Sequence, residues 1–153
     1  MKRVAFFVLA FIAIVIADDK DIEEIAEKFG SDVAEVKICL EELKIDTKEI
    51  LPLLQNWENI KPEEITEDVK QSLTTYSLFL ACILEKTGMM VDSKLVTDKL
   101  IEDMEADKEI VITDKKALEE CINSLNEDSQ LTRENRVFGL MLCTLDQMGE
   151  DKK

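Results

Sequence analysis

Histidine is entirely absent from this chain of 153 residues, and its absence excludes the commonest catalytic arrangements. A Ser-His-Asp or Cys-His site needs an imidazole as its general base. Glycine is also scarce, and Gly30, Gly88, Gly139 and Gly149 are too dispersed to form a phosphate-binding loop. No segment has the acidic ligand pattern of a calcium-binding loop. We therefore expect no catalytic residues, no enzymatic activity and no cofactor.

Cysteine is present, but in a pattern that disfavours a metal site. Cys39, Cys82, Cys121 and Cys143 are separated by 42, 38 and 21 residues, so no CxxC pair exists. Without such a pair and without histidine, a zinc site is not expected. In an exported chain, four cysteines predict two disulfide bonds, with three connectivities open. The alternative is four buried free thiols.

Positive charge is in short supply as well. The sequence has 19 lysines and arginines against 34 aspartates and glutamates, a net charge of −15. Such a chain repels nucleic acid and anionic membrane surfaces. The composition favours a soluble protein, as a monomer or weak dimer, that neither binds nucleic acid nor inserts stably into a membrane.

The N-terminal segment has the composition of a signal peptide. Met1, Lys2 and Arg3 are followed by an apolar run from residue 4 to 16, then by Ala17 and two aspartates. The alternative, a membrane anchor, needs about 20 apolar residues, and this run is shorter. We therefore predict a signal peptide over residues 1–17, a single helical ligand-binding domain over residues 18–153, and a secreted, extracellular protein.

The segment over residues 73–88 predicts a central helix, which is expected to start at Thr66 or Glu67. Apolar side chains cover nearly its whole circumference, so this helix is expected to be buried. Gly88, at its end, predicts its termination. Cys82 lies in its middle, and the other three cysteines lie on segments with helical periodicity.

Helices are also predicted before the central one. The segment over residues 21–44 has a break at Gly30, and Asp32 with Glu35 matches a capping box that restarts the helix. A short helix over residues 46–54 is predicted to carry Pro52 in its first turn.

Further helices are predicted after the central one. Their expected starting points are Asp92 or Ser93, Thr113 or Asp114, and Thr132. The β-branched run at residues 110–112 has no second strand to pair with and is interpreted as a loop. The fold class predicted from the pattern is all-α, with six to seven short helices, no sheet and two disulfides.

The stretch LACILEKTGMMVDSKL, over residues 80–95, resembles the third-cysteine region of insect odorant-binding proteins. Most members of this family have six cysteines, and the four found here match the first, third, fourth and sixth. Leu78 and Glu134 occupy the positions of the second and fifth, which pair with each other in the family. This joint loss is similar to the four-cysteine "minus-C" subgroup. The resemblance extends over about residues 21–148.

The resemblance implies a fold of helices around an apolar cavity, with pairings Cys39–Cys82 and Cys121–Cys143. It also implies carriage of small hydrophobic ligands, such as odorants, pheromones or fatty-acid-like compounds, with a membrane receptor as a further candidate partner. An alternative is a secreted interaction protein, salivary, seminal or from venom, that has the same fold but a packed core.

A pocket for small apolar molecules needs mostly apolar walls with a few polar groups for orientation. Plain core packing is the alternative role for every residue proposed for such walls. The candidate ligand-binding residues are Trp57, Leu73, Tyr76, Leu80, Leu84, Leu100, Met104, Leu118, Ile122, Leu140, Met141 and Thr144.

Overall fold

The computed structural model describes residues 19–56, 66–108 and 110–147, and in this part of the chain it is almost entirely helical. Seven helices and one short hairpin are present there, which confirms the predicted all-α class. The elements are a first helix over residues 19–29, α2 (Val33–Leu43), α3 (Thr47–Asn56), α4 (Glu67–Lys86), β1 (Met90–Val91), β2 (Lys94–Leu95), α5 (Thr97–Ala106), α6 (Lys115–Glu127) and α7 (Arg133–Gln147).

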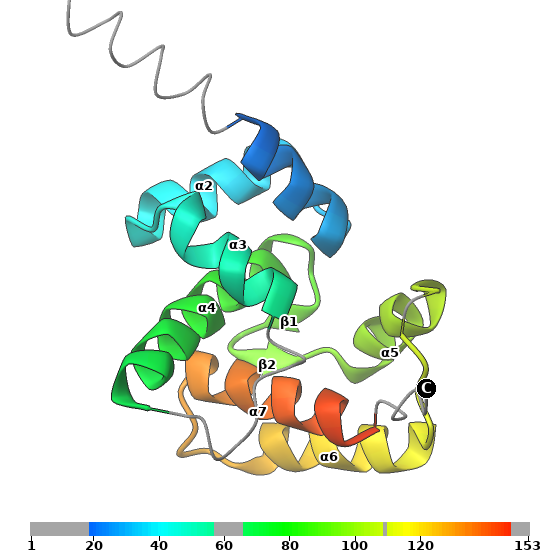
Figure 1. Cartoon of the computed structure of the whole chain (residues 1–153). Helices are drawn as coiled ribbons and strands as arrows, with labels where there is room; N and C mark the ends of the chain where they lie inside the picture. Colours follow the sequence, from blue (N-terminus) through cyan, green and yellow to red (C-terminus); the bar gives the residue numbers. More distant parts are fainter. Residues whose placement is uncertain (1–18, 57–65, 109, 148–153) are drawn as a thin grey trace, which may run out of the picture.

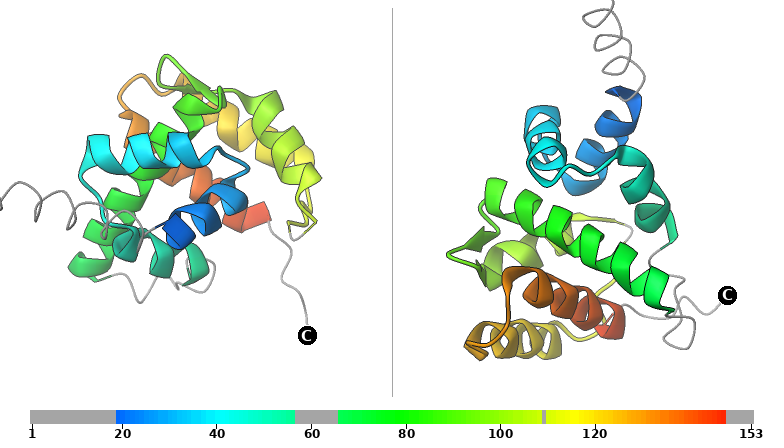
Figure 2. Two further views of the ribbon diagram at one scale, coloured as in Figure 1. Left: turned by 90° about the horizontal axis from the view of Figure 1, so that it is seen from above. Right: turned by 90° about the vertical axis from the view of Figure 1, so that its left-hand side faces the viewer.

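The helix α4 lies at the centre of the arrangement. The first helix, α2 and α3 lie on one side of it, and α7 with α6 lies on the other (Figures 1 and 2). The pair α4 and α7 forms the most extensive contact between elements, followed by α6 and α7. The helix α5 lies to one side, next to α6 (Figure 1).

Most helix starts are set by the polar residues that the sequence indicated. Asp32 and Glu35 form the predicted capping box of α2, in which the Asp32 N–H donates to the Glu35 carboxylate at 3.3 Å. Thr66, Asp114 and Thr132 each accept a hydrogen bond from the backbone N–H three residues later. These bonds satisfy N–H groups that a helix leaves without a partner in its first turn.

The central helix ends at Lys86, and Gly88 lies just past its end, as predicted. Gly88 has a φ of +75°, which a glycine adopts without the strain that a side chain would cause. Its N–H donates to the Glu85 carbonyl, and the Met89 N–H donates to the Leu84 carbonyl at 2.8 Å. This is a Schellman motif, and it turns the chain sharply towards the hairpin.

The hairpin corrects two predictions. No sheet was expected, yet β1 and β2 pair antiparallel, with Met90 opposite Leu95. Asp92 and Ser93 were expected to cap a helix, but their φ values of 51° and 62° make a two-residue turn of type I′. The helix α5 consequently begins later, at Thr97. Strands of two residues are too short to show an alternation of apolar and polar side chains, so the sequence pattern did not predict them.

The position of Pro52 is a further correction. It lies in the sixth position of α3, beyond the first turn in which it was predicted. The reason is that Asp46 accepts from the Lys48 N–H at 2.9 Å, which starts the helix at Thr47. The predicted start at residue 46 was therefore within one residue of the observed start, and only the place of Pro52 in the first turn was wrong.

The two disulfides have the pairing that the family resemblance implied. Cys39 joins Cys82, and Cys121 joins Cys143, with Cα–Cα distances of 5.8 and 5.9 Å. The first bond ties α2 to α4, and the second ties α6 to α7. Each closes a long loop, of 43 and 22 residues in sequence separation. Loops of this size contribute about 3–4 kcal/mol each through the restricted unfolded chain.

The core is divided into two clusters of buried side chains. One cluster joins the first helix, α2, α3 and α4, and it includes Phe79 and both cysteines of the first disulfide. The other joins the end of α4, the hairpin, α5, α6 and α7, and it includes Leu118 and Ile122. Leu80 packs against both clusters, so α4 connects the two parts of the core.

Polar side chains from α6 and α7 fix the hairpin in place. Asn126 makes two hydrogen bonds of 2.8 Å with the backbone of Leu95, one to its N–H and one to its carbonyl. Arg136 is buried, with 4% of its surface exposed, and donates to the carbonyls of Ser93, Leu125 and Asp128. A buried guanidinium requires such partners because desolvation of its charge is costly.

Candidate functional site

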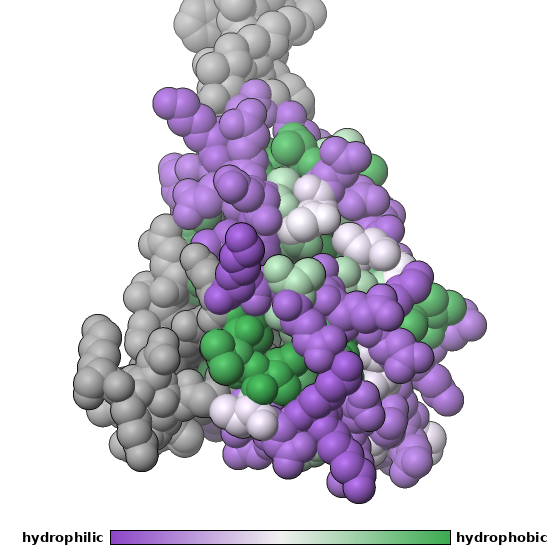
Figure 3. Space-filling model, turned by 90° about the vertical axis from the view of Figure 1, so that its right-hand side faces the viewer, coloured by the Kyte–Doolittle hydropathy of each residue, from purple (hydrophilic) through white to green (hydrophobic). Residues whose placement is uncertain are grey.

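A cavity of about 220 Å³ lies where the two core clusters meet. Side chains from the first cluster, such as Phe29 and Tyr76, form one wall. Side chains from the second cluster, such as Leu100 and Leu140, form the other. The face on the right of Figure 1 shows apolar side chains framed by hydrophilic ones (Figure 3). The cavity therefore has an apolar interior within a strongly charged surface.

Eight of the twelve predicted ligand-binding residues line this cavity. They come from α4, α5 and α7, which lie far apart in the sequence and converge here because their apolar faces share the core. They are Tyr76, Leu80, Leu84, Leu100, Met104, Leu140, Met141 and Thr144.

The structure places the other predicted residues elsewhere. Leu118 and Ile122 are fully buried in the second cluster and do not reach the cavity. Their periodic positions on α6 mark core packing, which periodicity alone does not distinguish from pocket lining. Leu73 lies in the first cluster and lines a separate groove between α4 and α7. Trp57 lies outside the described residues, so its pocket role stays a prediction.

Nine lining residues were missed by the sequence analysis. Four of them are polar, two lie in segments predicted to connect helices, and three are apolar residues on predicted helices. The two methionines after Gly88 were one available signal, because methionine adapts to varied ligand shapes. The missed residues are Lys28, Phe29, Leu54, Ile83, Thr87, Met89, Asp103, Asp107 and Ile110.

Two threonines in the lining present acceptor oxygens. The Thr87 hydroxyl donates to the Ile83 carbonyl at 2.9 Å, and the Thr144 hydroxyl donates to the Leu140 carbonyl at 2.9 Å. A hydroxyl has only one proton, and in both residues it is used within the helix or at its end. The lone pairs of these oxygens remain to accept a hydrogen bond.

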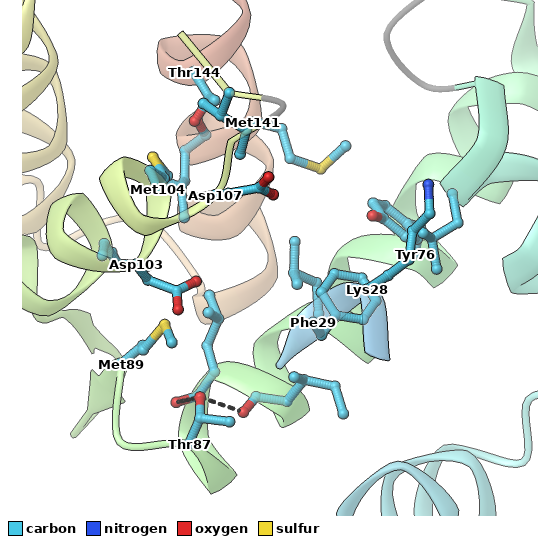
Figure 4. Close-up of a pocket in the computed structure, with 17 residues that line it drawn as sticks. Lys28, Phe29, Tyr76, Thr87, Met89, Asp103, Met104, Asp107, Met141 and Thr144 are labelled. Carbon is cyan, nitrogen blue, oxygen red and sulfur yellow. Dashed lines mark hydrogen bonds between the residues drawn. The ribbon is translucent and has the colours of Figure 1, made fainter. Parts of the chain in front are cut away.

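Two carboxylates lie on one side of the cavity. Asp103 and Asp107 come from α5 and its C-terminal cap, and both point into the space between the walls (Figure 4). Lys28 lies across the cavity from them (Figure 4). Burial of Asp103, followed by the charge of Asp107, raises the pKa of the Asp103 carboxyl above its ordinary value of 3.8. The negative charge of Asp107 thus adds to the effect of desolvation in disfavouring the ionised form of Asp103.

Most of the residues that line the separate groove between α4 and α7 are polar. Its volume is about 310 Å³, and its lining includes Leu73, Ser77, Glu134 and Phe138. Ser77 is buried and donates to the Leu73 carbonyl at 2.8 Å. The groove lies beside the positions that the family resemblance assigns to the two missing cysteines, which are residues 78 and 134.

Two further kinds of site are not found in the described parts of the chain. No three aspartate, glutamate, cysteine or histidine side chains are grouped there in a way that could hold a metal ion. The helices described there include none with the length and apolar character that crossing a bilayer requires.

The architecture is that of a helical binding protein whose core is cross-linked by two disulfides and which has a partly open, mainly apolar cavity between its two core clusters. A family model described as PBP/GOBP family matches residues 20–147, which is most of the chain. The chain belongs to this family, the insect odorant-binding proteins, and its four cysteines in two disulfides fit the minus-C subgroup. Searches of curated proteins and of solved structures gave no significant match. Members of this family are binding proteins rather than enzymes.

Proposed function

We propose that this protein is a secreted carrier that binds small hydrophobic molecules, of the odorant or pheromone type, in the cavity between its two core clusters. The observation that supports this function most directly is the cavity itself. A secreted interaction protein with a packed core would have no need of an apolar space of about 220 Å³. An apolar cavity of roughly 150 Å³ already binds benzene, so this one suits a small ligand.

The lining provides what such a ligand needs. Burial of apolar ligand surface contributes about 25 cal/mol per Å² and supplies most of the affinity. Met89, Met104 and Met141 line the cavity, and their flexible side chains adapt to ligands of different shape. A few polar groups then fix the orientation of the ligand.

The test is displacement of a fluorescent apolar probe from the purified, oxidised protein. We expect saturable binding with a micromolar midpoint, and displacement by medium-chain alcohols or esters. Replacing half-buried Met104 with tryptophan fills the cavity and should abolish probe binding. The matched control is Leu142→Trp on α7, at a side chain that is 50% exposed and lies outside the cavity.

Probe binding that is unchanged in Met104→Trp, while the fold persists by circular dichroism, would contradict this location of the site. No saturable binding of any apolar probe would favour the packed-core alternative. Tryptophan emission gives a second readout, because the predicted pocket role of Trp57 requires a saturable change in emission on ligand addition.

A further inference from the structure

We infer that the cavity selects ligands whose polar group donates hydrogen bonds, and that it binds a protonated primary amine more tightly than a carboxylate. This inference concerns the class of ligand and rests on the proposed function. It follows from three features of the lining that point the same way: the acceptor character of its polar groups, the charge of its rim, and the direction of α5.

The first feature is the excess of hydrogen-bond acceptors. The hydroxyl groups of Thr87 and Thr144 donate their hydrogen bonds to backbone carbonyls, so towards the cavity they present only lone pairs. Asp103 and Asp107 are acceptors when ionised. A ligand with a hydroxyl or ammonium group can bond to these oxygens, whereas a carboxylate or ester oxygen has no proton to offer them.

The second feature is the charge around the ligand. Among the described residues that line the cavity, Asp103 and Asp107 are acidic and Lys28 alone is basic, which leaves one net negative charge. Lys28 lies across from the two carboxylates, and all three residues are exposed to solvent (Figure 4). A cation placed beside the carboxylates relieves their mutual repulsion, whereas an anion there increases it.

The third feature is the helix α5 itself. It ends at Ala106, and its last turn has no basic residue. The C-terminal end of a helix carries a partial negative charge from its carbonyl groups, and this charge favours a nearby cation. Asp107 follows directly as the C-cap, so the helix end and both carboxylates act in the same direction on a group between the walls.

The experiment compares three ligands with the same eight-carbon chain by probe displacement at neutral pH: octylamine, octanol and octanoate. We expect octylamine to bind about tenfold more tightly than octanoate, with octanol between them. The preference should shrink at high salt, because the rim is open to solvent. In the variant Asp103→Asn with Asp107→Asn, the ratio of amine to acid affinity should fall below about threefold.

The control variant changes the same number of charges on the same helix. Asp98→Asn with Glu102→Gln alters two exposed residues of α5 that do not line the cavity. We expect this variant to keep the preference for octylamine. An equal loss in the control would assign the preference to overall charge and overturn the inference.

The outcomes separate the inference from the proposed function. Equal binding of all three ligands, or tighter binding of octanoate, leaves the carrier function intact and overturns the selection for donors. Failure of all three to displace the probe, together with no binding of any other apolar compound, contradicts the proposed function itself.

Discussion

At the scale of single residues, Gly139 shows why a glycine is placed inside a helix at a cost of about 1 kcal/mol relative to alanine. A Cβ atom at this position would lie 2.5 Å from Leu125 Cδ2 of α6. The missing side chain thus permits the close approach of α6 to α7, the two helices that the second disulfide joins.

We expect Gly139→Ala to destabilise the protein despite the better helix propensity of alanine. The reason is the clash with Leu125, which must shift or deform the contact between the helices. In a Leu125→Ala background the clash is removed, and the same change should raise the free energy of unfolding by about 1 kcal/mol. Urea denaturation of the four proteins measures both effects. If Gly139→Ala changed the free energy of unfolding equally with Leu125 and with Leu125→Ala, the close approach of Leu125 to residue 139 would not be the cause.

Asp103 gives the second residue-scale prediction, which concerns pH. Its pKa is raised in the folded protein, so the folded state holds the proton up to a higher pH than the unfolded chain does. The ionised carboxylate therefore lowers stability above its raised pKa, and this cost disappears below the ordinary value of 3.8. Asp103→Asn should raise the melting temperature at neutral pH and leave it unchanged below pH 3.8.

The control for this prediction is Glu102→Gln, which removes one negative charge from an exposed position of the same helix. If Asp103→Asn raised the melting temperature equally at both pH values, the raised pKa of Asp103 would not explain the gain. The same conclusion would follow if Glu102→Gln gave an equally large gain.

At the scale of elements, the hairpin β1–β2 is the part of the fold that the sequence did not predict. Asn126 and Arg136 hold it in place, and Met89 at its base lines the cavity. The position of one cavity wall therefore depends on two polar residues that belong to other elements.

We expect Arg136→Met to destabilise the protein by about 3 kcal/mol, because three backbone carbonyls lose the charged donor that the buried Arg136 provides. The matched control is Arg133→Met on the same helix. Arg133 forms an ion pair with Glu85 in which the two side chains are 33% and 36% exposed, so its loss should cost less than about 1 kcal/mol. Urea denaturation measures the free energy of unfolding of both variants. Equal decreases in the two variants would contradict the role of Arg136 in holding the hairpin in place.

The elements also show where sequence reasoning succeeds. Helix starts at Asp32, Thr66, Asp114 and Thr132 were predictable because capping depends on residues close together in the chain. The hairpin was not, because its stability comes from Asn126 and Arg136, more than thirty residues away. The cavity falls between these cases. Its apolar walls follow the helix periodicity, whereas Asp103 and Asp107 resemble any other acidic surface residues until the fold brings them to the rim.

At the scale of the whole molecule, the third disulfide of the family suggests a stabilised variant. Glu134 and Ser77, the neighbour of Leu78, line the same groove between α4 and α7. We expect Leu78→Cys with Glu134→Cys to oxidise to a third disulfide and to raise stability by about 2–4 kcal/mol, less any packing lost with Leu78. A thiol count and a melting curve measure this. Two free thiols with both native disulfides intact would show that these positions do not face each other.

The two native disulfides also determine what happens to the chain when its backbone is cut. The loop from Cys39 to Cys82 and the loop from Cys121 to Cys143 follow one another without overlap. A single cut inside either loop leaves one covalent molecule. A single cut between Cys82 and Cys121, in the tract that contains the hairpin and α5, leaves two fragments with no covalent link. After such a cut, only the packing of α4 on α7 and the surrounding core would keep the two walls of the cavity together.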